Sequence, residues 1–245
     1  MLAQGTVKIC SLRQPLHAEW VVEAGADLFG LIFAEARRQV SVAVAREIVM
    51  RGRAARPDGT LRSVGVFVEQ SVDEINRTAD AVGIDLVQLH RPTVISSGGR
   101  IERPTILVVH ASAETTLDSI ARLAEDFEAT GSMLAGIAVD AFTKDARGGT
   151  GTIANWVVAR QVAQRYPTVL AGGLYPDNVG HAISDVGPIG VDVSSGVETD
   201  GEKDRAKILA FVRAARQGFQ ASVGQVDRVP LGQSAKPVEG AQPLL

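Results

Sequence analysis

The chain has little cysteine and no long apolar run, and each shortage excludes a class of protein. Cys10 is the one cysteine among 245 residues, so no disulfide can form within the chain. No stretch approaches the roughly 18 uninterrupted apolar residues of a membrane-spanning helix. The N-terminus also lacks the charged-then-apolar plan of a signal peptide. We therefore expect a cytoplasmic protein with no membrane contact.

The chain also lacks a large excess of either acidic or basic residues. The net charge is −3, and acidic and basic residues are mixed along the chain without a long basic stripe. Nucleic acids and anionic membranes are therefore not expected partners, and a small molecule is favoured. With 45% hydrophobic residues, the chain can bury one large core, which predicts a single domain.

Short β-branched runs alternate with longer segments of helical period. Runs such as LFGLIF are apolar at successive residues, as is typical of parallel strands covered on both faces. Eight such units in about 215 residues predict an α/β fold, a (β/α)₈ TIM barrel, rather than an open doubly wound sheet. The expected strands are Thr6–Cys10, Leu28–Ala34, Ser63–Val68, Asp85–His90, Thr105–His110, Leu134–Asp140, Thr168–Leu174 and Ile189–Ser194.

Helix signals fall between these strands. They are Pro15, Ser71 with its capping-box partner Glu74, and Pro176. The weakest expected helix is the segment RPTVISSGGR between the fourth and fifth strands. Residues 1–218 are predicted to form the barrel domain. Residues 219–245 mix Gln, Gly, Pro and Ser without period, and we expect a disordered tail.

Active sites of this fold lie at the C-terminal ends of the strands. The seventh strand runs into a glycine pair and the eighth into a Ser-Ser-Gly segment, and small residues let backbone N–H groups approach a phosphate. Each segment taken alone could equally be an ordinary tight turn. The GGTG segment at 148–151 lacks the lysine of a P-loop and is weak evidence for a nucleotide. The predicted phosphate-binding residues are Gly172, Gly173, Ser194, Ser195 and Gly196.

Cys10 and Asp140 end the first and sixth expected strands, on roughly opposite sides of the barrel mouth. A thiol and a carboxylate that face each other suit removal of a proton at one atom and delivery of a proton at another, without a metal. This arrangement predicts isomerase chemistry. The alternatives are a packed cysteine and a carboxylate that caps a helix or forms a surface ion pair.

Seven ordered motifs resemble one known family. They are VKIC at Val7, EAGAD at Glu23, VGVFV at Val64, VQLH at Val87, GGTG at Gly148, LAGGL at Leu170 and VDVSSGVE at Val191. Together they resemble phosphoribosylanthranilate isomerase of tryptophan biosynthesis, over residues 7 to about 215. The resemblance implies a (β/α)₈ barrel that converts N-(5′-phosphoribosyl)anthranilate to 1-(2-carboxyphenylamino)-1-deoxyribulose 5-phosphate, without cofactor or metal.

The resemblance also implies roles for individual residues. Cys10 corresponds to the general base that removes the ribose C2′ proton. Asp140 corresponds to the general acid that protonates the ring oxygen, with Asp145 as its rival. Arg38, rather than Arg37, matches the arginine that holds the anthranilate carboxylate. The remaining expected substrate-binding residues are His90 and Asp192. Lys8 lies on the same strand face as Cys10, and we hypothesise that it is the cation that favours the thiolate form of Cys10.

Four positions near the expected catalytic face depart from the family pattern. They are Ser11 and Arg91, where glycine is usual, Gln39, where tyrosine is usual, and Asn155, where an acidic residue is usual. None of them removes a proposed proton-transfer group. We therefore expect these four residues to affect how the substrate fits the site more than they affect the proton-transfer chemistry.

Two other functions stay open at this stage. One is an isomerase of a related phosphoribosyl compound of the histidine pathway, although such enzymes typically use paired aspartates and the first strand here carries Cys10. The other is a non-catalytic sugar-phosphate-binding paralogue, which Ser11 and Arg91 favour and the presence of Cys10 and Asp140 disfavours. Monomer and homodimer are both compatible with the sequence.

Overall fold

Eight parallel strands close into a barrel in strict sequence order. The computed structural model describes residues 2–90, 99–112, 115–141 and 152–226. Each strand pairs with the next, and β8 returns to pair with β1, so the predicted TIM barrel is confirmed. The strands are β1 (Thr6–Ile9), β2 (Leu28–Ile32), β3 (Arg62–Phe67), β4 (Leu86–His90), β5 (Thr105–His110), β6 (Leu134–Asp140), β7 (Thr168–Ala171) and β8 (Gly190–Val193).

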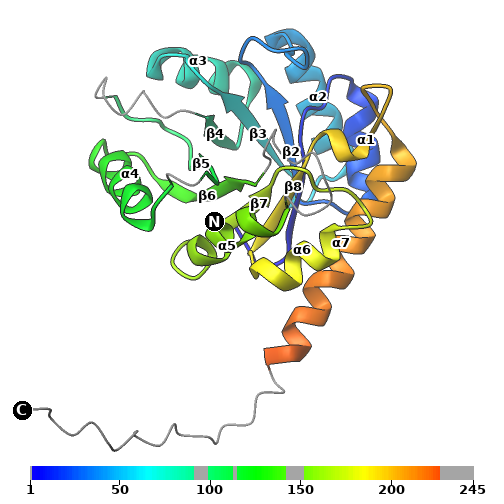
Figure 1. Cartoon of the computed structure of the whole chain (residues 1–245). Helices are drawn as coiled ribbons and strands as arrows, with labels where there is room; N and C mark the ends of the chain where they lie inside the picture. Colours follow the sequence, from blue (N-terminus) through cyan, green and yellow to red (C-terminus); the bar gives the residue numbers. More distant parts are fainter. Residues whose placement is uncertain (1, 91–98, 113–114, 142–151, 227–245) are drawn as a thin grey trace, which may run out of the picture.

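Helices surround the barrel, as Figure 1 shows. A short 3₁₀ helix, η2 (Ser195–Val197), and a small hairpin of β9 (Glu198–Thr199) and β10 (Glu202–Lys203) follow β8. The α-helices are α1 (Pro15–Ala24), α2 (Val42–Ala55), α3 (Val72–Val82), α4 (Leu117–Ala129), α5 (Thr152–Ala163), α6 (Val179–Val186) and α7 (Arg205–Val226).

The helix signals are mostly confirmed. Pro15 begins α1, where its missing N–H costs no hydrogen bond. The capping box forms at α3, because Ser71 accepts from the N–H of Glu74 while Glu74 accepts from that of Ser71. The expectation for Pro176 was wrong, because α6 begins three residues later at Val179. Residues 91–98 of the weakest expected helix lie outside the described residues, and the described segment 99–104 is not helical.

The last helix corrects the expected start of the tail. Helix α7 continues past residue 218 to Val226. Its Phe219, the first residue of the expected tail, is buried in the hydrophobic core. Burying a phenyl ring stabilises a fold by about 1.5–3 kcal/mol, which favours continuation of the helix beyond this residue. The segment 227–245 lies outside the described residues.

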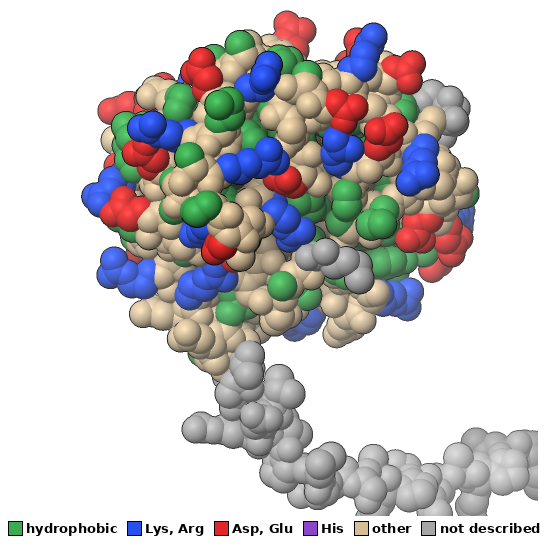
Figure 2. Space-filling model, turned by 180° about the vertical axis from the view of Figure 1, so that it is seen from behind, with side chains coloured by type: hydrophobic (Ala, Val, Ile, Leu, Met, Phe, Trp, Pro, Cys, Tyr) green, Lys and Arg blue, Asp and Glu red, His purple; other side chains and the backbone are tan. Residues whose placement is uncertain are grey.

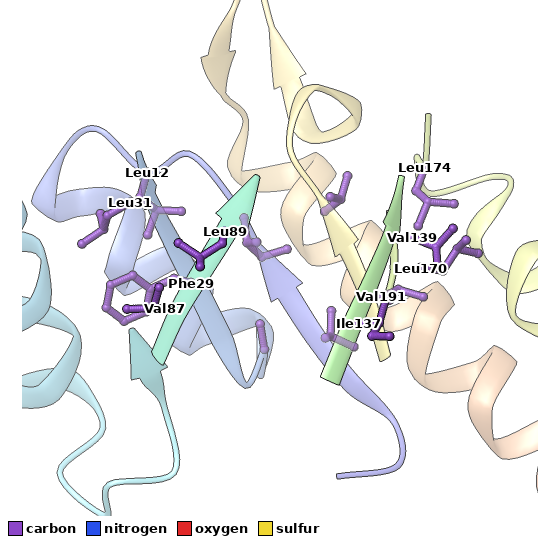
Figure 3. Close-up of a cluster of buried hydrophobic side chains, with 14 of the residues drawn as sticks. Leu12, Phe29, Leu31, Val87, Leu89, Ile137, Val139, Leu170, Leu174 and Val191 are labelled. Carbon is purple, nitrogen blue, oxygen red and sulfur yellow. The ribbon is translucent and has the colours of Figure 1, made fainter. Parts of the chain in front are cut away.

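Strand alternation separates two hydrophobic clusters. The larger one fills the layer between the barrel and the helices, and Figure 3 shows its strand residues, such as Val87 and Val191. The smaller one includes Leu28, Val64 and Leu86, which alternate with outward-facing neighbours along their strands and therefore lie inside the barrel. The inward-facing positions nearer the C-terminal strand ends are not part of this cluster, and their side chains can line a site.

The surface is mixed in charge. Figure 2 shows acidic and basic side chains interspersed over one face of the molecule. Among the described residues, no helix has both the length and the apolar character needed to cross a membrane.

Candidate active site at the mouth of the barrel

A cavity of about 350 Å³ opens at the C-terminal ends of the strands. It is lined by side chains and loops from most of the barrel. All ten residues expected from the sequence to form the site lie in its lining, so the structure brings the expected site together, while their roles stay predictions. These residues are Cys10, Arg38, His90, Asp140, Gly172, Gly173, Asp192, Ser194, Ser195 and Gly196.

Cys10 follows β1 directly and is buried beside the ammonium group of Lys8. Both side chains point into the barrel, whereas Ile9 between them packs in the outer core. Gly30 on β2 leaves the space that they share. A Cβ atom there would lie 2.6 Å from Cys10 Sγ and 3.2 Å from Lys8 Nζ. A larger residue at this position would displace the thiol.

Lys8 is fully buried and forms an ion pair with Asp192, with Nζ 2.7 Å from Oδ2. Burial by itself lowers the pKa of Lys8, but the negative charges of Asp192 and of the Cys10 thiolate outweigh it, and the pKa is raised. The ammonium group therefore stays charged. The structure thus brings the Lys8 ammonium group and the Cys10 thiol together, and the effect of Lys8 on the thiol stays the hypothesis made from the sequence.

The second carboxylate oxygen of Asp192 is unsatisfied. Asp192 Oδ1 is buried and has no hydrogen-bond partner among the described residues, although the residue lines the cavity. A buried acceptor without a donor costs roughly 1–3 kcal/mol. A ligand hydroxyl in the cavity would remove that cost.

Asp140 ends β6, across the cavity from Cys10 and three strands away through β8 and β7. Its side chain is 28% exposed, and His110 Nδ1, at the end of the neighbouring β5, lies 3.7 Å from Asp140 Oδ2. His90 lies at the end of β4. Burial, together with Lys8 and His110, lowers the pKa of His90 to about 4, so its imidazole is neutral at pH 7.

The loops after β7 and β8 supply small residues to the lining of the cavity. Gly172 and Gly173 have φ values of +87° and +66°, a conformation that glycine adopts readily and other residues do not. The 3₁₀ helix η2 begins at Ser195, and its N-terminus borders the cavity. A short helix after β8 is a recurrent phosphate site of this fold, because its N–H groups point at the anion.

Arg38 lines the cavity, and Glu198 holds its guanidinium group. Arg38 Nε and Nη2 donate to the two carboxylate oxygens of Glu198 at 2.9 and 2.6 Å. Lys203 Nζ donates to the same carboxylate at 2.8 Å. Burial raises the pKa of Glu198, but its hydrogen bonds with Arg38 and Lys203 outweigh this, and the pKa is lowered.

The sequence did not single out Glu198 or Lys203. Glu198 ends the quoted motif VDVSSGVE, which was a usable signal. Lys203 belongs to no motif, and its burial follows only from the way in which the hairpin folds back. The rival acid Asp145, the GGTG segment and Arg91 lie outside the described residues, and the side chain of Asn155 is not described.

Two departures from the family pattern have structural consequences. Ser11 has a φ of +67°, the region that glycine favours, and its hydroxyl lies 2.8 Å from that of Ser194. The usual glycine is thus replaced by a residue that keeps the glycine-like backbone and contacts the loop after β8. Gln39 donates from Nε2 to the carbonyl of Phe33 at 2.9 Å, which braces the loop after β2.

The chain is similar to proteins of one family. A family model described as N-(5′-phosphoribosyl)anthranilate isomerase matches residues 7–214. A protein of that name from Roseiflexus castenholzii is 41% identical over 212 residues, which cover 86% of this chain and 97% of the relative. One from Dehalococcoides mccartyi is 34% identical over 209 residues, covering 85% and 94%.

Solved structures show the same similarity. Phosphoribosyl anthranilate isomerase from Thermotoga maritima superposes with a TM-score of 0.69 at 32% identity, covering 86% of this chain and 98% of that one. A second structure of this kind of enzyme contains reduced 1-(o-carboxyphenylamino)-1-deoxyribulose 5-phosphate. It superposes with a TM-score of 0.65 at 30% identity, with the same coverage.

Proposed function

The chain belongs to the N-(5′-phosphoribosyl)anthranilate isomerase family, and we propose that its Cys10 and Asp140 carry out the family's rearrangement by proton transfer. The protein is an isomerase of tryptophan biosynthesis. One observation carries the assignment of residues: a thiol and a carboxylate line opposite sides of one cavity, with a buried ammonium group beside the thiol.

The first step opens the ribose ring. Asp140 donates its proton to the ring oxygen, the bond between C1′ and that oxygen breaks, and the anthranilate nitrogen shares its electron pair with C1′ to form an iminium ion. This step uses Asp140 in its protonated form as a general acid. His90 is neutral at pH 7, so it adds no positive charge that would favour the deprotonated form of Asp140.

The second step removes a proton from carbon. The Cys10 thiolate takes the C2′ proton, the C–H electron pair forms a double bond between C1′ and C2′, and the iminium electron pair returns to nitrogen. The resulting enaminol becomes the ketone when C1′ gains a proton and the C2′ hydroxyl loses one. Lys8 stabilises the thiolate for this step, and Asp192 holds Lys8 in place.

The two ends of the cavity match the two ends of the substrate. We place the phosphate on the backbone N–H groups near Gly173 and Ser195, and the anthranilate carboxylate on Arg38. Asp192 Oδ1 then accepts a hydrogen bond from a ribose hydroxyl, which supplies the donor that this buried oxygen lacks. In this orientation the reacting carbons lie between Cys10 and Asp140.

The activity is tested by generating phosphoribosylanthranilate in situ and following the loss of its fluorescence when the purified protein is added. The proposal predicts a loss whose rate is proportional to protein concentration. A protein that only binds sugar phosphates would give at most a stoichiometric change. That result would contradict an enzymatic function.

Replacing Gly173 with alanine should raise KM and the inhibition constant of inorganic phosphate about tenfold or more. The methyl group forces a left-handed residue to strain or shift, and the loss of one hydrogen bond to a charged group is worth about 1.5–3 kcal/mol. Gly187→Ala is the matched control, because Gly187 has a similar φ of +65° at the end of α6 and open space around it. Equal phosphate inhibition of Gly173→Ala and Gly187→Ala would remove Gly173 from the phosphate site.

Replacing Arg38 with alanine should weaken binding of a product analogue that carries the 2-carboxyphenyl group by about 10- to 150-fold, the range for a hydrogen bond to a charged group. An analogue with a plain phenyl group should lose little. Arg38→Lys should fall between wild type and Arg38→Ala, because lysine restores the charge but not the planar fork. If Arg38→Ala weakens both analogues equally in calorimetric titrations, Arg38 does not bind the carboxylate.

We also propose a cytoplasmic location, and the charge of the proposed substrate supports it. The phosphate and carboxylate charges of phosphoribosylanthranilate prevent it from crossing a bilayer unaided. The enzyme would therefore work where the compound is made. Cell fractionation of the source organism tests this by the distribution of the activity between soluble and membrane fractions.

A further inference from the structure

The hairpin after β8 brings two charged side chains back to the barrel mouth. Strands β9 and β10 pair antiparallel, with Lys203 opposite Glu198. The two residues between the strands, Asp200 and Gly201, have φ values of +53° and +81°, as in the tight turns typical of two-residue hairpins. This geometry places Glu198 and Lys203 next to each other.

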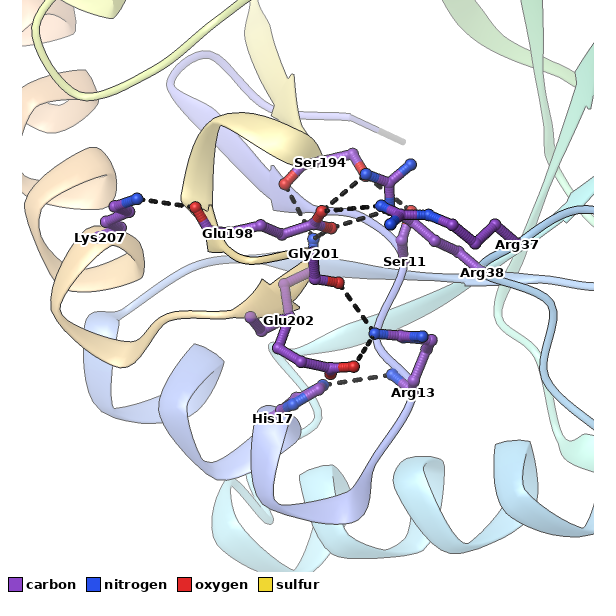
Figure 4. Close-up of polar contacts among 11 residues, drawn as sticks. Ser11, Arg13, His17, Arg37, Arg38, Ser194, Glu198, Gly201, Glu202 and Lys207 are labelled. Atoms are coloured by element: carbon purple, nitrogen blue, oxygen red, sulfur yellow. Dashed lines mark hydrogen bonds and ion pairs between the residues drawn. The ribbon is translucent and has the colours of Figure 1, made fainter.

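Side chains from other elements fix the hairpin in place, as Figure 4 shows. Arg13, in the segment before α1, donates from Nη2 to the carbonyl of Gly201 at 2.9 Å and also bonds Glu202. Lys207 of α7 donates from Nζ to the carbonyl of Glu198 at 2.7 Å. The hairpin is therefore held at its tip and at its base.

The Glu198 carboxylate lies between the cations Arg38 and Lys203, and the exposed Arg37 places a third cation, Nη2, 3.9 Å from Glu198 Oε2. The Glu198 side chain is 6% exposed, and that of Lys203 is 1% exposed. Lys203 also donates to the carbonyl of Ser194 at 2.9 Å, so one chain of contacts joins the phosphate-binding loop to Arg38. One buried anion between the cations Arg38 and Lys203 leaves a net charge of +1 in this trio, which still attracts a substrate carboxylate.

The contact with Glu198 also determines which N–H donors of the Arg38 guanidinium group remain available to a ligand. Arginine has five N–H donors in a rigid plane, and Glu198 accepts from two of them. A two-point contact to a buried carboxylate fixes both the position and the tilt of the plane. The other donors of Arg38 can then serve a ligand in the cavity that Arg38 lines.

We infer that Glu198 is a positioning residue, which holds the Arg38 guanidinium in one orientation so that it recognises the carboxylate of the substrate. The inference rests on the role proposed above for Arg38. In this role Glu198 acts on substrate recognition through Arg38 and does not contact the reacting atoms. The β9–β10 hairpin is then part of the specificity machinery of the enzyme.

The test is Glu198→Gln, measured with the carboxyphenyl and phenyl product analogues. Glutamine keeps the shape but places an NH₂ group against a donor of Arg38 or Lys203. We expect the carboxyphenyl analogue to bind about tenfold or more weakly and the phenyl analogue to change less than about twofold. KM for the substrate should rise by a similar factor while kcat changes little. Glu198→Asp keeps the charge and should restore part of the loss.

Glu202→Gln is the matched control. It removes one negative charge from the same hairpin, but Glu202 contacts Arg13 and not Arg38. It should leave the ratio of the two affinities unchanged. A stronger affinity of Glu198→Gln for the carboxyphenyl analogue would show that Glu198 competes with the substrate for Arg38. An equal loss for both analogues would show a structural role. Either result overturns the inference.

A double-mutant cycle separates this inference from the proposed function. In the Arg38→Ala background, Glu198→Gln should no longer change the ratio of the two affinities, because the group that it positions is gone. If Arg38→Ala itself leaves the ratio unchanged, the proposed role of Arg38 fails. If Arg38→Ala lowers the ratio and neither Glu198→Gln nor Glu198→Asp does, only the role of Glu198 fails.

Discussion

Replacing Cys10 with serine should lower kcat about 10²- to 10⁴-fold and change KM little, because a positioned general base contributes a factor of this size. A hydroxyl is a much weaker acid than a thiol, so Lys8 cannot keep serine deprotonated at neutral pH. Serine is also close in size to cysteine, so the cavity keeps its shape. The pair of Lys8 with Asp192 does not depend on the sulfur atom.

Steady-state kinetics with phosphoribosylanthranilate made in situ measures this effect. Inhibition by inorganic phosphate serves as the control for an intact binding site and should match wild type. A variant that kept more than about a tenth of the wild-type kcat would show that Cys10 is a packing residue. In that case the base would have to be sought elsewhere in the cavity.

Replacing Asp140 with asparagine should lower kcat by a similar factor. The amide keeps the shape of the carboxyl group but has no acidic proton to give to the ring oxygen. Substrate binding should persist, because the groups assigned to the phosphate and to the carboxylate lie on other strands and loops. The measurement is kcat at several pH values, together with the affinity for the carboxyphenyl analogue.

Asp145→Asn is the companion variant for this prediction. Asp145 lies five residues after Asp140, and we expect its replacement to leave most of the activity. A fully active Asp140→Asn combined with an inactive Asp145→Asn would transfer the role of general acid to Asp145. The chemistry would stay the same, but the acid would come from the loop instead of the strand.

The barrel could be predicted from the sequence because each strand is a short apolar run with its own signal. Thr105–His110 and Leu134–Asp140 were predicted to the residue, and most of the other strands differ by one or two residues at an end. The glycine pair after β7 made that strand look longer than it is, since Thr168–Ala171 ends before Gly172. The placement of the site at the strand ends followed from the fold.

The contacts within the site could not be predicted in the same way. The pairing of Arg38 with Glu198 joins residues 160 positions apart, and that of Lys8 with Asp192 joins residues 184 positions apart. Such contacts depend on closure of the barrel between β8 and β1 and on the hairpin after η2. Sequence patterns report the local periodicity of apolar residues, and the burial of a single lysine such as Lys203 leaves no trace in that periodicity.

Single-turnover loss of phosphoribosylanthranilate fluorescence, with enzyme in excess, tests most directly the claim that one cavity drives the rearrangement with its own thiol and carboxylate. Wild type, Cys10→Ser and Asp140→Asn are compared side by side after each has been shown to bind inorganic phosphate. The account predicts rapid loss with wild type and loss at least about 100-fold slower with each variant. Constant fluorescence with wild type, or equally fast loss with all three proteins, would contradict it.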